Sequence, residues 1–434
     1  MIKVLIDVSR YVFVALFAIY LLMSYRIFTI QDEEDRSYRC VLQNMIMFLF
    51  HFLAFGLLFI SSQDFTYIWL YLAQMIIMFL YLVIFHLVYK NADFLLLNNM
   101  CMMIMIGFIM ISRINLEEGI RQTVLVFLGM YLTLIVPVFM QKNKKLRNIP
   151  WLYGVIGIVL LLLVLLVGQA QNGANLSIKI FGITFQFSEF IKIVYAFFIA
   201  AMFNRSTKFG NVVLTTGLAA VHVLILVISK DLGGALIYFV VYLVMVYVAT
   251  KKAGYIFLGG MAGVVASMSA YHLFAHVRTR VYTWQDPWSY IDGEGYQITQ
   301  SIFAIGTGGW FGEGLYQGMP YRIPMVEMDF MFSAICEEFG IIFGVGIILL
   351  MLNTFLLMMD VGMKSQGKFY RLLSVGLATA YGFQIFLTIG GGIKFIPLTG
   401  VTLPLISYGG SSAWSTLLLF AVIQGLYRMK SQDK

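Results

Sequence analysis

A few ionisable residues stand in or beside long apolar stretches, and these residues are candidates for chemistry. In the segment FQFSEFIKI, Glu189 and Lys192 are three residues apart and can neutralise each other on one helix face. Lys230 and Asp231 stand in SKDLGGAL, at a tight connection between two apolar stretches. Each pair has a structural interpretation, as a buried ion pair or as a turn, and a functional one, as a substrate-facing pair. Charged residues are costly inside a membrane, so both interpretations stay open.

Asp329 is the strongest candidate, because it begins the predicted helix DFMFSAICEEFG directly after a long polar segment. A carboxylate there faces the free N–H groups of the first turn and any cavity above them. On an ideal helix Cys336 and Gly340 lie below Asp329, with Ser333 beside them and Glu337 farther round. This face leaves room for a substrate, which makes Ser333 and Glu337 candidate binding residues. The alternative is that Asp329 only caps the helix.

The elements that must position these residues are membrane helices. Of the 434 residues, 61% are apolar and 12% are charged, against roughly 45 to 50% and about 25% in soluble domains. A membrane-crossing helix needs about 20 mostly apolar residues. Runs of that kind predict an all-α polytopic membrane protein with thirteen helices, at residues 11–24, 42–61, 67–89, 95–112, 122–140, 150–168, 187–203, 211–228, 232–249, 255–275, 330–358, 372–391 and 405–427.

The basic loop at residues 142–147 is the strongest topological signal, and we place it in the cytoplasm. Alternation then puts the N-terminus and the segments 276–328 and 390–412 on the outer side. The net charge of +8 follows the positive-inside tendency, so it does not require a nucleic acid partner. The two outer segments are rich in glycine and aromatic residues, which predicts ordered loops around a wet cavity on the outer face.

Other motifs are weak. The stretch GMKSQGKF places Phe369 where a phosphate-binding loop needs Ser or Thr, and no strand is predicted before it. The three cysteines have no paired spacing, and the five histidines form no metal-binding pattern. The sequence therefore argues against nucleotide binding, a disulfide framework and a dedicated metal site.

Five segments together resemble the SEDS family (shape, elongation, division and sporulation), which includes RodA, FtsW and SpoVE proteins. The segments are FQFSEFIKI, KDLGGAL, DGEGYQITQSIFAIGTGGWFGEGL, IPMVEMDFMFSAICEEFG and KFIPLTGVTLPLISYGGSS. The resemblance implies a ten-helix core of the GT-C type over residues 95–434, with the long outer loop 276–328. Residues 1–94 are then about three additional N-terminal transmembrane helices.

The resemblance also implies an activity: a peptidoglycan glycosyltransferase that polymerises lipid II at the outer face of the bacterial cytoplasmic membrane. The essential Asp of an HTDF-like family motif falls on Asp329. Glu327 and Met328 replace the usual His and Thr, and Thr388 stands where many members have Asn. These changes leave the implied reaction class intact.

Sugar transfer from lipid II requires a base for the acceptor hydroxyl and cations for the departing pyrophosphate. Asp329 is the predicted base. Guanidinium groups suit phosphate oxygens, so Arg278 and Arg280 are predicted to bind the pyrophosphate. Lys394 is a third cation candidate, and Ser407 a further substrate-binding candidate. Each cation has an alternative role as an interfacial anchor. A divalent cation such as magnesium is compatible with the chemistry, although no ligand set is evident.

Partners follow from the resemblance as well. Family members act with a class B penicillin-binding protein, a transpeptidase, and with other elongation or division proteins. The competing function is a lipid-linked oligosaccharide flippase or transporter, in which Glu189, Lys192 and Asp231 would line a path through the bilayer. No inverted repeat is evident, and the richest polar group of residues lies on one face, so the enzyme is favoured.

Overall fold

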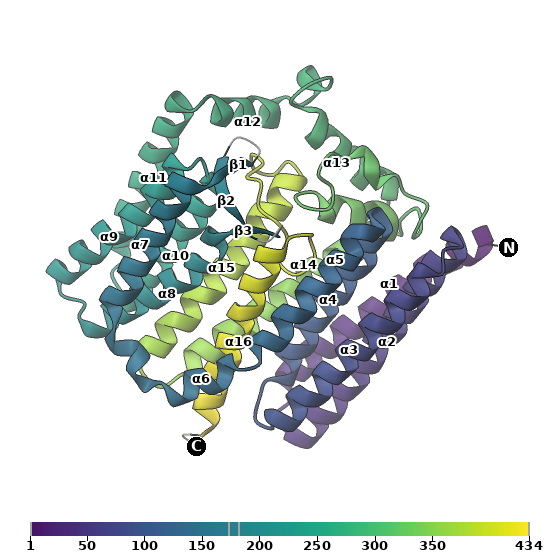
Figure 1. Ribbon diagram of the computed structural model, residues 1–434, viewed down its shortest axis with the longest axis horizontal. Helices are drawn as coiled ribbons and strands as arrows, with labels where there is room; N and C mark the ends of the chain where they lie inside the picture. Colours follow the sequence, from purple (N-terminus) through teal and green to yellow (C-terminus); the bar gives the residue numbers. More distant parts are fainter. Residues whose placement is uncertain (1, 172–173, 181–182, 433–434) are drawn as a thin grey trace.

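The computed structural model describes residues 2–171, 174–180 and 183–432, and gives only the backbone at residues 2, 144, 169–171, 174–180, 183–184 and 430–432. All thirteen predicted apolar segments coincide largely with helices, most of which run side by side (Figure 1), although the last predicted segment, 405–427, begins five residues before its helix. Twelve helices in the described ranges are long and apolar enough to cross a membrane, with α5 and α6 counted as one span. The prediction of a helical, multi-pass membrane protein is confirmed. The twelve do not include α16, so the thirteenth span stays a prediction.

The first three helices form a separate layer at the right of Figure 1. They are α1 (Ile2–Thr29), α2 (Glu33–Ser62) and α3 (Thr66–Val88). The Asp32 side chain accepts the Glu34 N–H and so caps α2 at its start. These helices pack on the rest of the chain: α1 on α14, α2 on α4 and α3 on α5. Residues 1–94 are therefore in close contact with the core.

The next elements are α4 (Phe94–Ile114), α5 (Leu116–Thr133), α6 (Val136–Lys142), the 3₁₀ helix η1 (Lys144–Asn148) and α7 (Pro150–Val167). Helix α4 is almost completely buried, since it lies between the N-terminal layer and the core. Asp93 and Asn115 cap α4 and α5 with their side chains. Pro137 stands at the start of α6, where a missing backbone N–H is tolerated. One predicted span, 122–140, is thus two helices joined at a short break.

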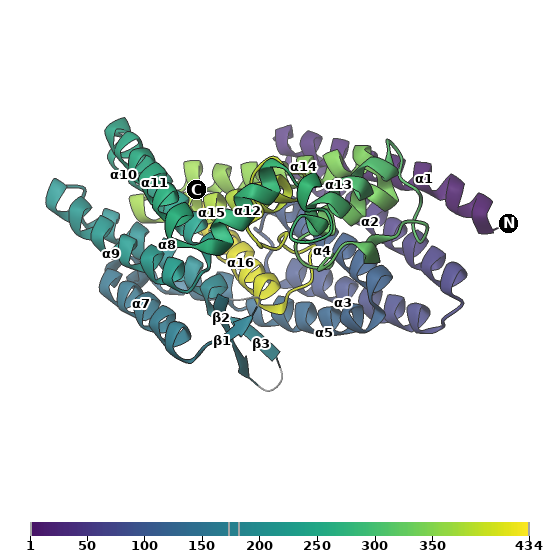
Figure 2. The same cartoon turned by 90° about the horizontal axis from the view of Figure 1, so that it is seen from above.

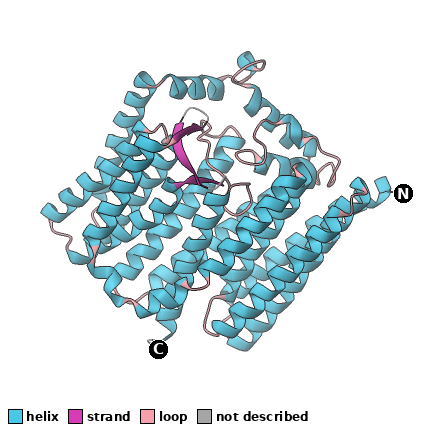
Figure 3. Cartoon of the chain, in the orientation of Figure 1, coloured by secondary structure: helices cyan, strands magenta, loops and turns pink. Residues whose placement is uncertain are grey.

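A three-stranded antiparallel sheet, which the sequence analysis did not predict, follows α7. Its strands are β1 (Gln169–Gln171), β2 (Ala174–Ile180) and β3 (Ile183–Gln186), in the order β1-β2-β3, and Ile178 pairs with Phe185. Figure 3 shows the strands in magenta among the helices. The Phe185 ring contacts Trp414 edge to face, with 6.2 Å between ring centres, so the sheet rests on α16.

Four helices follow and occupy the left of Figure 1 together with α7: α8 (Phe187–Arg205), α9 (Phe209–Ile228), α10 (Leu232–Thr250) and α11 (Ala253–Leu273). Helix α8 is mostly buried and packs on α7, α10 and α15. No residue of α11 is buried, and its packing contacts are with α10 and α12. Helix α8 therefore carries its ionisable residues into the protein interior.

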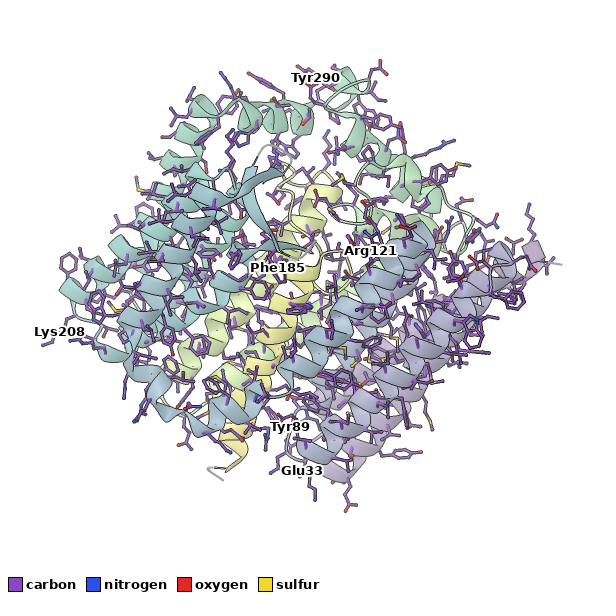
Figure 4. The ribbon with its side chains drawn as sticks, viewed as in Figure 1. Glu33, Tyr89, Arg121, Phe185, Lys208 and Tyr290 are labelled. Carbon is purple, nitrogen blue, oxygen red and sulfur yellow. The ribbon has the colours of Figure 1, made fainter. Side chains whose placement is uncertain are left out.

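The outer segment 276–328 is more regular than the predicted loop. It contains α12 (Ala275–Gln285), η2 (Trp288–Tyr290), α13 (Tyr296–Gly308) and η3 (Pro320–Arg322). Figure 4 places Tyr290 at the end of the molecule opposite Glu33, and Figure 2 shows α12 and α13 from above. Arg10 donates to the Gly312 carbonyl at 3.2 Å, so the start of α1 lies on the same side as this segment. This agrees with the predicted outer N-terminus.

Helix α14 (Met331–Lys364) is broken at Gly340, whose φ of 87° suits glycine. The broken backbone is satisfied from the outer segment, because Ile341 N donates to Gly309 O at 2.9 Å and Glu313 N donates to Glu337 O at 2.9 Å. The last helices are α15 (Lys368–Gly392) and α16 (Gly410–Gln432), joined by residues 393–409. The two outer segments meet here, since Tyr408 N donates to Glu327 O at 2.7 Å.

Candidate active site

A cavity of about 190 Å³ lies where both outer segments meet the starts of α8 and α10. Five residues that the sequence singled out line this cavity: Glu189, Lys192, Asp231, Arg280 and Asp329. We call it the catalytic cavity, after the role proposed for it below. Lys230 and residues 399–402 complete much of the remaining wall. The structure therefore brings together three short motifs and one arginine that are separated by up to 140 residues in the chain.

Asp329 lies in a turn, and the prediction that it begins a helix was wrong by two residues. Helix α14 begins at Met331, its N-cap residue is Phe330, and no side chain caps it. The Asp329 carboxylate has no hydrogen bond or ion pair with another described residue. The backbone of residues 325–328 turns back on itself instead, with Asp329 N donating to Met325 O at 3.2 Å. This geometry argues against a capping role for the side chain.

The surroundings of Asp329 change its acidity. The pKa of Asp329 is raised to about 6, chiefly by burial in the cavity wall; Arg280 opposes this shift, and the neighbouring Glu327 carboxylate contributes to it. A carboxylate with a pKa near 6 is mostly ionised at neutral pH and is a stronger base than an ordinary aspartate. Asp329 is thus suited to accept a proton.

Arg280 is the cation that faces Asp329. Its Nη1 donates to the Thr399 carbonyl at 3.1 Å, which holds the side chain of α12 against the second outer segment. A Cβ at Gly400 would lie 3.6 Å from Arg280 Nη2 and 3.8 Å from Asp329 Oδ2. Gly400 therefore separates the two charges and leaves a gap between them. Burial lowers the pKa of Arg280, but a guanidinium stays charged in proteins.

Asp231 has the structural role that the sequence left open, and its substrate-facing role stays a prediction. It is the N-cap of α10, where Oδ1 accepts the Gly234 N–H at 2.8 Å, and its Oδ2 accepts a hydrogen bond from Ser188 at 3.1 Å. Burial raises the pKa of Asp231, and these two hydrogen bonds work against that shift. The residue also lines the catalytic cavity. Its hydrogen bonds fix the carboxylate in place.

Glu189 and Lys192 form the predicted ion pair on α8, with 2.6 Å between Oε2 and Nζ. Sequence reasoning missed two of their partners. Lys192 Nζ also donates to Gln384 Oε1 at 2.7 Å, and Ser415 donates to Glu189 at 3.0 Å. Gln384 Nε2 in turn donates to the Thr402 carbonyl at 3.1 Å. The pair therefore connects α8, α15 and α16 to the cavity wall. The sequence signal that could have revealed Gln384 is that it is the one glutamine within the largely apolar α15.

Two predicted cations lie elsewhere. Arg278 is exposed on α12, while Arg280, two residues farther along the same helix, lines the cavity. Lys394 has a φ of 60° and its carbonyl accepts the Trp284 Nε1–H at 3.2 Å, which links the two outer segments. Neither Arg278 nor Lys394 lines the catalytic cavity. Their proposed role in substrate binding stays a prediction.

The remaining predicted residues are placed around the cavity. Ser333 is buried and 2.6 Å from the hydroxyl of Ser301, which donates to Gly392 O at 2.7 Å and so joins α13 to α14 and α15. Ser407 accepts the Leu403 N–H at 3.1 Å within a turn. Glu337 lines a different cavity. In the described residues, no group of three or more His, Cys, Asp or Glu side chains is placed to hold a metal ion.

Comparison with known proteins shows the family to which the chain belongs. The model of the family described as cell cycle proteins, which is named for FtsW, RodA and SpoVE, matches residues 92–432. This chain belongs to that family. The match leaves out α1, α2 and α3, so these helices are additional to what the family shares.

Curated relatives cover most of the chain. It is 32% identical over 360 residues to the peptidoglycan glycosyltransferase RodA of Mycobacterium tuberculosis, which covers 76% of this chain and 77% of that protein. It is 33% identical over 283 residues to the stage V sporulation protein E of Bacillus subtilis, covering 62% of this chain and 75% of that one.

Solved structures share the fold. One comes from work entitled "Structural coordination of polymerization and crosslinking by a peptidoglycan synthase complex", and matches with a TM-score of 0.67 and 25% identity over 79% of this chain and 99% of that chain. The RodA rod shape determining protein of Thermus thermophilus matches with a TM-score of 0.58 and 23% identity, over 78% and 97% of the two chains.

Proposed function

We propose that this protein polymerises lipid II into glycan strands at the outer face of the bacterial cytoplasmic membrane and releases polyprenyl pyrophosphate. Its membership of the family and the names of its relatives support the general class, a peptidoglycan glycosyltransferase. The observation that carries the specific mechanism is the Asp329 carboxylate, which faces a cavity without a hydrogen-bond or ion-pair partner among the described residues and stands across Gly400 from Arg280.

Asp329 is the proposed general base. In the reaction, the 4-hydroxyl of the acceptor sugar attacks the anomeric carbon of the donor sugar, and the bond to the pyrophosphate oxygen breaks. The hydroxyl proton must leave as the new bond forms, and a carboxylate with a pKa of about 6 can take it. Because the Asp329 carboxylate accepts no hydrogen bond from another described residue, its lone pairs are available to a bound hydroxyl.

Arg280 is the proposed partner of the departing pyrophosphate. Its Nη1 is occupied by Thr399 O, while Nη2 is directed toward Gly400 and the cavity. Lys230 also lines the cavity and is exposed, so it adds a second positive charge. Positive groups aimed at the charge that develops on the leaving group lower the barrier. Arg278 and Lys394 are proposed to bind substrate farther out, beyond the cavity lining.

Glu189, Lys192 and Asp231 are proposed to shape the floor of the cavity. Their hydrogen bonds to Gln384 and Ser188 hold the floor rigid, and the residues remain in reach of a substrate because they line the cavity. This arrangement is that of a preorganised site, in which the polar groups are already oriented before substrate arrives. Ser333 and Ser407 are proposed to support the two outer segments around it.

The catalytic cavity, at about 190 Å³, is smaller than the roughly 300 to 1,000 Å³ of a typical small-molecule pocket. It therefore fits the reacting groups, and the polyprenyl chain must lie outside it. An apolar groove of about 740 Å³ runs between α10, α14 and α15 and ends at residues 389–395. The connection between α15 and α16, which begins at residue 393, continues into residues 399–402 of the catalytic cavity wall. This continuity supports the groove as the place of the lipid tail.

The proposed partner is a class B penicillin-binding protein that cross-links the new strands, together with other elongation or division proteins. The support is the structural likeness to a chain from a study of a peptidoglycan synthase complex. The exposed apolar faces of the helices are compatible with binding a partner's membrane helix.

The test is polymer formation from lipid II by the purified protein, with and without a candidate transpeptidase. Glycan strands should form with the wild type and be absent with Asp329→Asn at equal membrane abundance. A flippase alone makes no strand, so translocation of lipid II without polymer would refute the proposed function. Addition of magnesium or a chelator, measured in the same assay, decides whether a divalent cation contributes.

A further inference from the structure

A second cavity on the outer face, of about 310 Å³, lies between α13, residues 313–323 and the start of α14. We call it the outer pocket. It shares no lining residue with the catalytic cavity. Its polar lining residues are Gln300, Thr307, Glu313, Gln317, Arg322 and Glu337. Neither the family resemblance nor the proposed mechanism gives this pocket a role.

Glu337 is the most informative residue of the outer pocket. Only 7% of its surface is exposed, and its Oε1 accepts the Met319 N–H at 3.0 Å. Its Oε2 has no hydrogen-bond partner among the described residues. A buried carboxylate oxygen without a partner is costly, and native proteins keep few such groups. The pocket thus contains a negative charge that the protein itself leaves incompletely compensated.

The nearby Arg113 does not pair with the Glu337 carboxylate. Arg113 Nε lies 3.0 Å from Glu338 Oε1, its Nη2 donates to the Gly318 carbonyl at 3.1 Å, and its guanidinium stacks on the Tyr316 ring. Arg113 is therefore engaged by the neighbouring Glu338. Glu313, which is exposed at the pocket, adds a second carboxylate. An ammonium group in the pocket would complete the hydrogen bonding of Glu337.

The opposite charge is also present. Arg322 is exposed and lines the pocket, and a guanidinium binds a carboxylate with two parallel hydrogen bonds. Gln300, Gln317 and Thr307 supply amide and hydroxyl groups of the kind that bind peptide bonds. A pocket with carboxylates, a guanidinium and amides matches a short peptide that carries both an ammonium and a carboxylate.

We propose that the outer pocket binds the peptide of the substrate through its free ammonium and carboxylate groups. This inference rests on the proposed function, because lipid II is the substrate that carries such a peptide next to its sugars. Glu337 follows Asp329 by eight residues, mostly on a helix that rises about 1.5 Å per residue, or roughly 12 Å in all. Three or four extended peptide residues span a similar distance.

The experiment compares two forms of lipid II, one with a free side-chain ammonium on the peptide and one with that amine acetylated. Initial polymerisation rates are measured against substrate concentration. Acetylation should raise the KM of the wild type about ten- to a hundred-fold, the value of one charge-assisted hydrogen bond, with little change in kcat. Glu337→Gln should show the raised KM with both substrates. Asp360→Asn, at the other end of α14, is the matched control and should behave as the wild type.

Two results overturn the inference. The first is a wild type that uses both substrates with equal KM, and this result does not depend on any variant folding. The second is a Glu337→Gln variant that still discriminates as the wild type does. A third comparison uses lipid II whose peptide carboxylate is amidated. The wild type should have a higher KM for this substrate than for unmodified lipid II, and Arg322→Gln should have equal KM values for the two. If the wild type makes no polymer from any substrate, the proposed function fails instead.

Discussion

The polar side chains between the N-terminal helices and the core differ from those of the catalytic cavity in how they are paired. Asn99 on α4 accepts hydrogen bonds from Tyr20 and Ser24 on α1 and donates to Asn353 on α14 at 2.8 Å. Gln43 on α2 donates to Ser24 at 2.5 Å. These residues are uncharged and buried, and together they join four helices. We call them the asparagine cluster.

The catalytic cavity has a different composition and a different pairing. Six of its lining residues are acidic or basic, and the Asp329 carboxylate has no hydrogen-bond or ion-pair partner among the described residues. Burial raises the pKa of Asp329, which means that the folded protein disfavours the charge it holds at neutral pH. A group that costs stability is retained when function needs it, whereas the asparagine cluster fits a structural role. The comparison predicts opposite effects of mutation in the two regions.

The largest effect is expected from Asp329→Asn. The change keeps the shape of the side chain and removes the base, so the polymerisation rate should fall by about 10² to 10⁴. Stability should be unchanged or slightly higher at pH 7.5, because the buried charge is gone. The measurements are the initial rate at matched membrane abundance and the melting temperature in detergent. An active variant would return Asp329 to a structural role.

The second effect separates two arginines on one helix. Arg280→Lys should lower the rate about thirty-fold to a thousand-fold, because a point charge cannot reproduce the fork that reaches both Thr399 O and the cavity. Arg278→Lys should change the rate less than about threefold, since Arg278 is exposed outside the cavity and a lysine there keeps the positive charge that binding substrate farther out requires. If Arg280→Lys kept a rate as high as that of Arg278→Lys, Arg280 would be removed from the site, and Lys394 or a bound cation would be the next candidate.

The third effect is a pH dependence that belongs to the catalytic cavity. The base must be ionised, and the pKa of Asp329 is about 6, so kcat/KM should be constant above pH 7 and fall about tenfold per unit below pH 6. Stability should move the other way. Because the pKa of Asp329 is raised in the folded state, folding favours the protonated carboxyl over the charged one. The destabilisation that the buried charge causes is therefore lost as the pH falls through 6. A rate that is flat down to pH 5 would exclude this base.

Sequence periodicity predicted the helices well, because each apolar run is a local property. It did not predict the break at Gly340, since the groups that satisfy the broken backbone come from residues 309–314. The β1–β3 sheet and the helices of the outer segment were also missed, because they lack the long apolar runs that the analysis relied on.

The site was predicted only in part, because local motifs show candidate residues but not which distant residues lie beside them. Short motifs pointed to Glu189, Asp231 and Asp329, and the structure brings these residues to one cavity. Local sequence did not distinguish Arg278 from Arg280, because the direction of each depends on how α12 lies against residues 399–402. The partner of Lys192, Gln384, lies 192 residues away, and no local pattern connects them.

The smallest effect on activity, with a clear effect on stability, is expected from Asn99→Ala in the asparagine cluster. The substitution leaves Tyr20, Ser24 and Asn353 each with one fewer partner, and hydrogen bonds between membrane helices contribute modestly. The variant should be less stable by about 1 to 2 kcal/mol, allowing for buried groups left unsatisfied. Below its melting temperature its polymerisation rate should stay within about twofold of the wild type.

The matched control for that variant is Ser269→Ala on α11. Among the described residues, the Ser269 hydroxyl bonds only to Val265 O of its own helix, so neither stability nor rate should change. The stability difference between Asn99→Ala and Ser269→Ala then measures what the cross-helix bonds of the N-terminal layer contribute. Should Asn99→Ala instead lower the rate as strongly as Arg280→Lys while remaining folded, the two regions would not be separate. The additional helices would then be part of the catalytic machinery, acting through α14, which carries Asn353 and begins two residues after Asp329.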